Sequence, residues 1–264
     1  MKQLYSFKIK KDVSMEDAWE ELENANIELA YASDDDGFVF IYGYLDSKTP
    51  IPKLSSLEEA SPYELPKIDW EAQWAEHGLD FHDGYVHVDL SLFGSVPKIL
   101  RLEPGPGFGD LSHPTTRLVL RLMSKYVQFN SLVDIGCGSG ILTLAAVAIG
   151  CPDPYGIDID PEALIHAFNN AKINQMEDLC HFCLPTDFIM PPSRPIVIVM
   201  NMIMSEQKEA LKMLQNINDS KGICLTSGVR NEETEEYLAL TREWKWELIE
   251  QIEEGDWKGF TFKR

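Results

Sequence analysis

A glycine-rich turn between an apolar strand and an apolar helix holds the clearest chemical pattern in this sequence. Residues 133–140 read Val-Asp-Ile-Gly-Cys-Gly-Ser-Gly, and a helix is predicted over 141–149. Gly136, Gly138 and Gly140 permit a sharp turn and leave no Cβ between the peptide N–H groups and a molecule above them. The spacing differs from the G-x-G-x-x-G that binds a pyrophosphate at a helix N-terminus. The turn is therefore typical of a site for a nucleotide-like cofactor.

A carboxylate follows the next predicted strand. The segment 154–159 is apolar and runs into Asp158-Ile159-Asp160. A carboxylate at this place can accept hydrogen bonds from both ribose hydroxyls of a nucleoside. A ribose-binding acid without a pyrophosphate motif favours S-adenosylmethionine as the cofactor. The alternative is a tight turn followed by a helix-capping Asp, which the order of strand, glycines, helix, strand and acid disfavours.

Asn201 directly follows the apolar segment 196–200, which predicts a central strand buried on both faces. Ligands of open α/β sheets lie at the carboxyl ends of the strands. Asn201 is therefore a candidate catalytic residue, whose amide oxygen can face an attacking amine or the methionyl end of the cofactor. The alternative is that Asn201 caps the helix predicted over 206–214.

The segment 103–116 combines glycines and prolines with an aromatic ring, ahead of an apolar helix predicted at 118–123. It reads Glu-Pro-Gly-Pro-Gly-Phe-Gly-Asp-Leu-Ser-His-Pro-Thr-Thr. So many glycines and prolines predict a loop close to a ligand, and Phe108 at its centre requires something that covers it. The proline after His113 suits the first helical position, with His113 or Ser112 as the cap. A role of His113 as a catalytic base is the alternative to capping.

Hydrophobic patterning predicts an α/β chain with two domains. Residues 1–65 show the order β-α-β-β and then a short helix at 57–64, which matches part of a ferredoxin-like α+β sandwich. Without a nucleophile or metal cluster, this domain is interpreted as a binding module, with a stabilising appendage as the alternative. A linker helix is predicted over 66–80. Strands and helices alternate over 81–264, from a strand at 84–93 onward, which predicts a Rossmann-like domain.

The charge balance separates classes of partner. The 264 residues include 43 acidic and 23 basic side chains, a formal charge of −20. Nucleic-acid backbones are held by Lys and Arg, so direct nucleic-acid binding is not expected. An acidic surface attracts basic partners and accelerates encounter with them, and solubility alone is the alternative.

Apolar runs and cysteines bear on the compartment. No run of about eighteen apolar residues occurs and the first residues lack a signal-peptide core, so we expect a cytoplasmic protein without membrane association. The odd number of cysteines suits reduced thiols. Residues 180–183 have a C-x-x-C spacing that could hold zinc or a redox pair. No second pair follows, so two strand cysteines are preferred and no metal is expected.

The motifs together resemble the PrmA-type ribosomal protein L-eleven methyltransferases over nearly the whole chain. The glycine and acid motifs fit any class I methyltransferase, whereas the Phe-Gly and His-Pro-Thr-Thr stretch is much more specific. The resemblance implies a ferredoxin-like domain that grips the substrate, a linker helix, and a Rossmann-like class I methyltransferase domain over 81–264. The points of likeness are Asp69-Trp70 to Trp74, Glu103-Pro104-Gly105, Phe108-Gly109, His113-Pro114-Thr115-Thr116, 133–140, 156–161, Asn201 and Glu254-Gly255-Asp256-Trp257.

By position, the resemblance implies S-adenosylmethionine as the cofactor. It also implies methyl transfer to lysine and N-terminal amino groups of a basic large-subunit ribosomal protein. Asn201 and backbone carbonyls near Phe108 are the candidates for orienting the amine, and the catalytic set is completed by His113. The implied cofactor contacts come from Phe108, Thr115, Asp134, Gly136, Asp158 and Asn201, to which the turn itself adds Gly138.

Two segments depart from the family pattern. The family's usual Thr-Gly-Thr-His turn is Asp110-Leu111-Ser112-His113 here, and Leu111 takes φ > 0 less readily than Gly. Asn201 is followed by Met-Ile-Met where the family commonly has Ile-Leu-Ala. Both segments lie at the expected amine entrance, so they bear on the substrate more than on the cofactor.

Three classes of function follow. The first is a protein N-methyltransferase that acts on a basic ribosomal protein, as a monomer. The second is a small-molecule or RNA methyltransferase on the same fold, and the third is a non-catalytic ribosome-binding module. Cofactor affinity separates the third class from the others, and labelling of the acceptor separates the first from the second.

Overall fold

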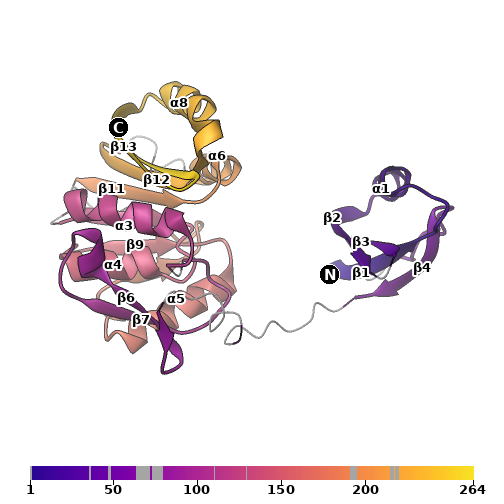
Figure 1. The fold of residues 1–264 in the computed structure, drawn as a ribbon, viewed down its shortest axis with the longest axis horizontal. Helices are drawn as coiled ribbons and strands as arrows, with labels where there is room; N and C mark the ends of the chain where they lie inside the picture. Colours follow the sequence, from indigo (N-terminus) through magenta and orange to yellow (C-terminus); the bar gives the residue numbers. More distant parts are fainter. Residues whose placement is uncertain are drawn as a thin grey trace. The chain divides into compact units, whose positions relative to one another are not determined.

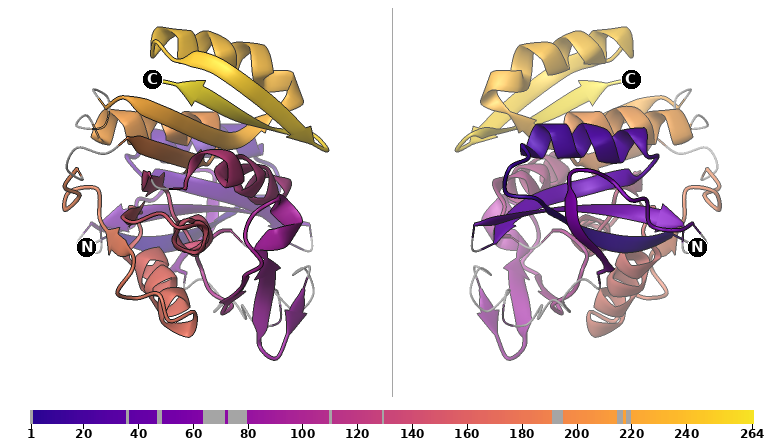
Figure 2. Two further views of the ribbon diagram at one scale, coloured as in Figure 1. Left: turned by 90° about the vertical axis from the view of Figure 1, so that its left-hand side faces the viewer. Right: turned by 90° about the vertical axis from the view of Figure 1, so that its right-hand side faces the viewer.

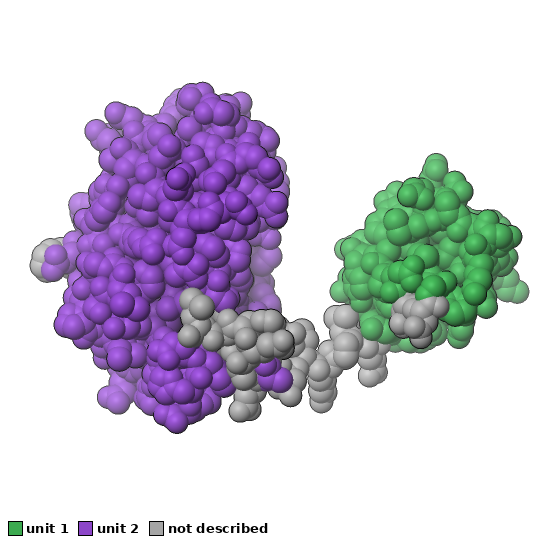
Figure 3. All heavy atoms as spheres, in the orientation of Figure 1, with its two compact units in different colours: residues 1–68 green, residues 69–264 purple. Residues whose placement is uncertain are grey.

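The computed structural model, shown in Figures 1 and 2, describes residues 2–35, 37–46, 49–63, 72, 80–109, 111–128, 130–190, 195–214, 217 and 220–264. The chain divides into two compact units, Met1–Ile68 and Asp69–Arg264, which Figure 3 colours separately. The linker helix predicted over 66–80 lies outside the described residues, except for positions 72 and 80. None of the helices in the described ranges is long and apolar enough to cross a membrane.

Unit 1 is a four-stranded antiparallel sheet with one helix. The alternation predicted for the first strand directs Tyr5, Phe7 and Ile9 into a core shared with the helix. Ser14 caps that helix by accepting the Asp17 N–H at 3.1 Å, as the capping-box pattern predicts. The strand order is β2-β3-β1-β4. The elements are β1 Lys2–Ile9, α1 Met15–Asn24, β2 Glu28–Asp35, β3 Phe38–Asp46 and β4 Leu57–Pro62.

The helix predicted over 57–64 is wrong, because residues 57–62 form β4. This strand pairs antiparallel with β1, and Phe7 lies opposite Ala60. Without β4, this edge of β1 would present a row of unpaired backbone N–H and C=O groups, and pairing outweighs the weak helical pattern. Unit 1 thus has the strand order and directions of a ferredoxin-like sheet with one described helix. Its assignment as a ferredoxin-like recognition domain stays a prediction.

Unit 2 contains a small three-stranded sheet made of β5 Phe81–His82, β6 Tyr85–Asp89 and β7 Ile99–Leu102. The strand predicted over 84–93 is correct only as far as Asp89. The Asp89 carboxylate accepts the Ser91 N–H at 2.9 Å and starts a 3₁₀ helix, η1, over Leu90–Phe93. As a result Leu92 leaves the alternating pattern, and 71% of its surface is exposed.

The main sheet of unit 2 has seven strands in the order β10-β9-β8-β11-β12-β14-β13. The first five run parallel, and β14 pairs antiparallel with β12 and β13. From β8 the chain continues to β9 and β10 on one side of the sheet, and from β11 it continues to β12 on the other side. Such a reversal places a crevice at the carboxyl ends of β8 and β11. The strands are β8 Ser131–Ile135, β9 Pro154–Ile157, β10 His181–Cys183, β11 Ile196–Asn201, β12 Gly222–Arg230, β13 Glu247–Glu254 and β14 Trp257–Lys263.

Helices cover both faces of this sheet, as Figures 1 and 2 show. Val197 and Val199 of β11 belong to the buried cluster under α3 and α4, whereas Ile198 and Met200 belong to the cluster under α6 and α8. Successive side chains of a strand face opposite layers, so the continuous apolar run marks a strand buried on both faces. The predicted Rossmann-like α/β fold is confirmed. The helices are α3 Pro114–Tyr126, α4 Ile141–Ile149, α5 Pro161–Ile173, α6 Met204–Met213, η2 Asn231–Glu233 and α8 Thr234–Glu243.

Candidate functional site

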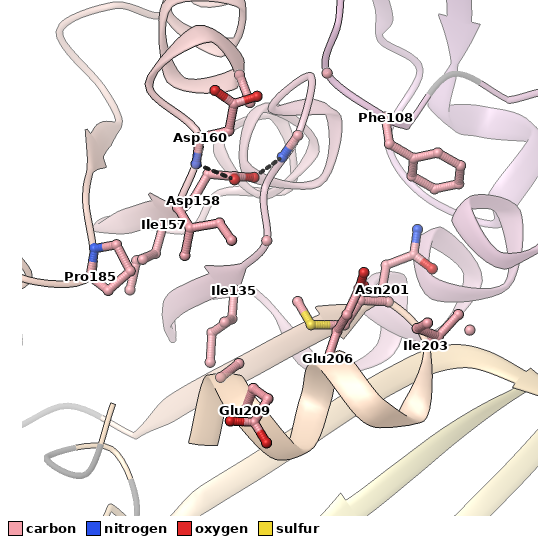
Figure 4. A pocket seen from close by; sticks show the side chains of 18 of the residues that line it. Phe108, Ile135, Ile157, Asp158, Asp160, Pro185, Asn201, Ile203, Glu206 and Glu209 are labelled. Atoms are coloured by element: carbon pink, nitrogen blue, oxygen red, sulfur yellow. Dashed lines mark hydrogen bonds between the residues drawn. The ribbon is translucent and has the colours of Figure 1, made fainter. Parts of the chain in front are cut away.

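A cavity of about 720 Å³ opens at the carboxyl ends of β8, β9 and β11. Figure 4 shows side chains that reach it from the strand ends, from α6 and from the loop that carries Phe108. This is the crevice expected where the connection of a parallel sheet reverses. The predicted site residues that line it are Phe108, His113, Thr115, Gly136, Gly138, Asp158 and Asn201.

The glycine turn is required by the close approach of a second loop. Gly136, Gly138 and Gly140 all have positive φ, and Gly138 has the most crowded surroundings. A Cβ on Gly138 would lie 2.4 Å from the Phe108 carbonyl oxygen. That oxygen accepts the Ser139 N–H at 2.8 Å, so the Phe108 loop lies directly on the turn. The Phe108 carbonyl, considered for orienting the amine, is thus engaged by the turn.

The structure shows which of Asp158 and Asp160 caps the following helix and which lines the cavity. Asp160 caps α5 by accepting the Glu162 N–H at 2.9 Å. The Asp158 oxygens accept the Gly138 N–H at 2.9 Å and the Asp160 N–H at 3.0 Å, and its carboxylate lines the cavity (Figure 4). The helix cap is therefore Asp160. A carboxylate has about four lone-pair sites, so Asp158 retains two for the hydroxyls of a ligand.

Two residues of α5 that the sequence reasoning missed hold the Phe108 loop in place. His166 accepts the Gly107 N–H at Nδ1 over 3.1 Å, so its Nε2 donates to the Glu103 carbonyl at 2.8 Å. Burial lowers the pKa of His166, which favours this neutral ring. Asn170 accepts the Glu103 N–H at 2.8 Å and donates to the Ser139 carbonyl at 2.9 Å. The available signal was a pair of polar residues, four apart, on the alanine-rich face of a predicted helix.

An aromatic wall borders the cavity. The rings of Phe108 and His113 lie 5.7 Å apart, and those of His113 and Trp257 lie 4.7 Å apart. His113 caps α3 through Nδ1, which accepts the Thr115 N–H at 3.4 Å, as the capping hypothesis predicts. Phe108 keeps 54% of its surface exposed, which leaves room for a ligand against it. Trp257 also lines the cavity and was not among the predicted site residues.

Leu111 avoids the backbone strain that a leucine would suffer at a position suited to glycine. Leu111 is not among the described residues with positive φ, and its side chain is buried in the core beneath α3. The Arg117 guanidinium donates to the carbonyls of Leu111 and Ser112. It also pairs with Glu254 at 2.6 Å. Leu111 therefore anchors the turn by burial instead of adopting the conformation that a glycine would permit.

Asn201 lies at the end of β11 and lines the cavity. Its Nδ2 donates to the Thr116 hydroxyl at 3.3 Å, while its Oδ1 is buried without a hydrogen-bond partner among the described residues. The alternative role of Asn201 as a helix cap is wrong, because α6 begins at Met204 with Ile203 at the cap position. A buried amide oxygen without a donor costs about 1–3 kcal/mol, which a ligand N–H or O–H can recover.

Gln207 holds the segment that carries Asn201 in place, and the sequence did not indicate this role. The fully buried Gln207 of α6 donates to the carbonyls of Met202 at 2.8 Å and Ser227 at 3.1 Å. Its Oε1 accepts the Tyr237 hydroxyl at 2.6 Å. The segment that carries Asn201 is thereby tied to β12 and α8.

The cysteines of the C-x-x-C segment are free thiols. Cys183 lies in β10 and Cys180 precedes it. Burial raises the pKa of Cys180 to about 11, so this thiol stays protonated and is a poor metal ligand or nucleophile. Among the residues that the structure describes, no group of three or more His, Cys, Asp or Glu side chains could hold a metal ion.

Asp134 lies behind the glycine turn and is not among the residues that line the cavity. It is fully buried, and its Oδ2 accepts the Thr143 hydroxyl at 2.8 Å. Desolvation raises its pKa to about 7. A direct cofactor contact from Asp134 stays a prediction.

We expect Asp134 to make the folded protein less stable as the pH rises. Its folded pKa of about 7 lies above the ordinary value of 3.8, so the stabilisation present below pH 4 is lost as the pH passes through 7. From pH 5 to pH 8 the loss is about 3 kcal/mol. Urea unfolding of the wild type and of Asp134→Asn at a series of pH values measures it. Parallel curves for the two proteins would contradict this expectation.

Known proteins match most of this chain. The family model for Ribosomal protein L11 methyltransferase (PrmA) matches residues 8–264. The ribosomal protein L11 methyltransferase of Colwellia psychrerythraea is 32% identical over 195 residues, which cover 71% of this chain and 66% of that protein. That of Thiobacillus denitrificans is 37% identical over 146 residues, which cover 55% and 48%. The matches therefore span about half to two thirds of the length of these relatives.

A solved structure agrees with these matches. The crystal structure of ribosomal protein L11 methylase from Lactobacillus delbrueckii subsp. bulgaricus superposes with a TM-score of 0.53 and 25% sequence identity, over 64% of this chain and 86% of that one. The family model, the curated relatives and the fold agree. This chain belongs to the ribosomal protein L11 methyltransferase (PrmA) family.

Proposed function

We propose that this protein transfers methyl groups from S-adenosylmethionine to lysine and N-terminal amino groups of ribosomal protein L11. The observation that carries the proposal is the cavity in which the Asp158 carboxylate, the glycine turn and the Phe108 loop meet. The family of the chain supports the reaction, and the names of its relatives supply the substrate. We further propose that the protein acts in the cytoplasm as a monomer and does not bind nucleic acid directly.

Several features of the cavity fit S-adenosylmethionine. Asp158 has acceptor sites for two ribose hydroxyls. A Cβ on Gly136 would lie 2.4 Å from the Met202 side chain, so the glycine lets Met202 pack directly against the turn. The apolar side chains of Ile157 and Ile159 line the cavity beside Asp158, where a flat adenine ring can pack. These residues would hold the nucleoside, while Asn201 lines the cavity at the end of β11.

The chemistry of the proposed reaction rests on the presentation of a neutral amine. When bound, S-adenosylmethionine supplies a methyl group that its sulfonium makes electrophilic. Phe108, Met202 and Ile203 line the cavity with apolar surface, which disfavours an ammonium and lowers the pKa of a lysine from its ordinary value near 10.4. Asn201 Oδ1 accepts an N–H of the amine and directs the nitrogen lone pair. Water takes the proton, so most of the acceleration comes from alignment.

Unit 1 is proposed as the substrate-recognition domain, which residues 1–65 were predicted to form. These residues carry 14 acidic and 6 basic side chains. Their negative charge suits a basic ribosomal protein, because complementary charge accelerates encounter and orients the partners.

The test is incubation with radiolabelled S-adenosylmethionine and separated ribosomal proteins, after calorimetry has measured cofactor binding. We expect label on ribosomal protein L11 alone, released as methylated lysine and a methylated N-terminal residue on hydrolysis. Cofactor binding without a labelled protein would favour a small-molecule or RNA acceptor. Failure to bind the cofactor would favour a non-catalytic module.

A further inference from the structure

Glu206 places an unpaired negative charge in the cavity. It lies in the first turn of α6, shortly after Asn201, and lines the cavity. Figure 4 shows its side chain extending from α6 on the same side of the cavity as Asn201. It makes no hydrogen bond or ion pair with any residue that the structure describes. Its neighbours in the lining include Ile203, Ala210 and Met213, which offer it no polar partner.

The other carboxylates of the cavity already have partners. Asp158 and Asp160 accept backbone N–H groups, and Glu209 pairs with Lys212 at 2.6 Å. Glu206 is exposed and, unlike them, has no partner among the residues that the structure describes. Asn201 lines the same cavity, and its Oδ1 also has no hydrogen-bond partner among the described residues. Acceptors without donors suit a ligand that carries only donors, such as an alkylammonium.

We propose that Glu206 determines specificity for a cationic acceptor, by binding the lysine ammonium as it enters the cavity. The inference rests on the proposed function and assigns the acceptor end of the same site. The Glu206 carboxylate binds the ammonium as it enters, and the side chain then moves on against the apolar lining of Phe108, Met202 and Ile203, where the charged form is disfavoured and one proton leaves to bulk solvent. The neutral nitrogen is left with its lone pair and stays close to the site of transfer.

Glu206 acts as a specificity residue and not as the general base. A carboxylate opposite an ammonium favours the charged form, so Glu206 stabilises the cation that binds and not the neutral amine that reacts. Its attraction for the ammonium acts on binding, and its loss should appear in KM. A base would instead change kcat and its pH dependence.

The test compares Glu206→Gln with wild type, using ribosomal protein L11 and radiolabelled S-adenosylmethionine. We expect KM for the protein acceptor to rise roughly tenfold with kcat within about twofold, as a charged hydrogen bond to substrate is lost. Cofactor affinity, measured by calorimetry, should not change. Glu206→Asp keeps the charge, so its KM for the protein acceptor should lie close to that of the wild type. High salt should reduce the difference in KM between wild type and Glu206→Gln, because salt screens the attraction between the Glu206 carboxylate and the lysine ammonium.

Glu236→Gln is the matched control, because Glu236 occupies the same place in the first turn of α8, is exposed, and lies outside the cavity. It removes one charge and should leave KM unchanged. An unchanged KM in Glu206→Gln, or an equal rise in both variants, would overturn the inference. Weaker cofactor binding with an unchanged acceptor KM would instead assign Glu206 to the cofactor. Failure of the wild type to label L11 would overturn the proposed function itself, which keeps the two failures distinct.

Discussion

Replacing Asp158 with alanine is expected to weaken the binding of S-adenosylmethionine about a hundredfold. Two hydrogen bonds from ribose hydroxyls to a charged carboxylate contribute about 1.5 kcal/mol each, and their sum corresponds to that factor. Asp158 also accepts the Gly138 N–H at 2.9 Å, so its loss loosens the glycine turn under the same ligand. Isothermal titration calorimetry with the cofactor measures the effect directly.

Two further variants separate ligand binding from the support of the turn. Asp158→Asn keeps the shape and one acceptor oxygen, so it should lose less affinity than the alanine variant. Asp178→Ala removes an exposed carboxylate away from the cavity and should bind the cofactor as the wild type does. Circular dichroism and thermal unfolding check that each variant folds. A folded Asp158→Ala protein with unchanged cofactor affinity would refute the ribose assignment.

Removing residues 1–65 is expected to abolish methylation of ribosomal protein L11 while cofactor binding remains. Units 1 and 2 bury separate hydrophobic clusters, so unit 2 keeps its own core after the truncation. A tethered recognition domain raises the effective concentration of substrate at the site, and its loss should lower kcat/KM at least about a hundredfold. Transfer of label to L11 is the measurement for both forms of the chain.

Calorimetry with S-adenosylmethionine is the control for this truncation. An unchanged dissociation constant shows that the cavity of unit 2 is intact. Retained methylation of L11 by the truncated chain would refute the recognition role of unit 1 and favour the stabilising appendage. Loss of cofactor binding together with methylation would show that unit 1 supports the fold of unit 2.

Local patterns in the sequence predicted the elements around the cofactor turn. The helix predicted over 141–149 is α4, with the same bounds. Glycines on both sides explain this agreement, because Gly140 and Gly150 are left-handed and end the helix at each side. His113 as the cap of α3 is equally local, since its partner is Thr115.

Short segments were decided by their partners instead. Residues 57–62 form a strand because they pair with an open edge of β1. The pattern of six residues gives no information about an edge that belongs to a distant segment. The predicted strand at 84–93 ended early because Asp89 captured a nearby N–H. In both places the hydrogen-bond partner outweighed a weak periodicity.

The sequence by itself determined the Rossmann-like α/β core, the glycine turn, and the residues 108, 113, 115, 136, 138, 158 and 201 that meet at one cavity. The core, the turn and the strand-end residues follow from periodicity, glycine conformation and strand order, which are local or topological, whereas the resemblance to the family supplied Thr115. Only the tertiary structure decided that Asp158 lines the cavity and accepts the Gly138 N–H while Asp160 caps α5. It alone revealed that His166 holds the Phe108 loop and that Glu206 has no partner within the described part of the chain. Such roles depend on which groups meet across distant segments, and no local pattern records those meetings.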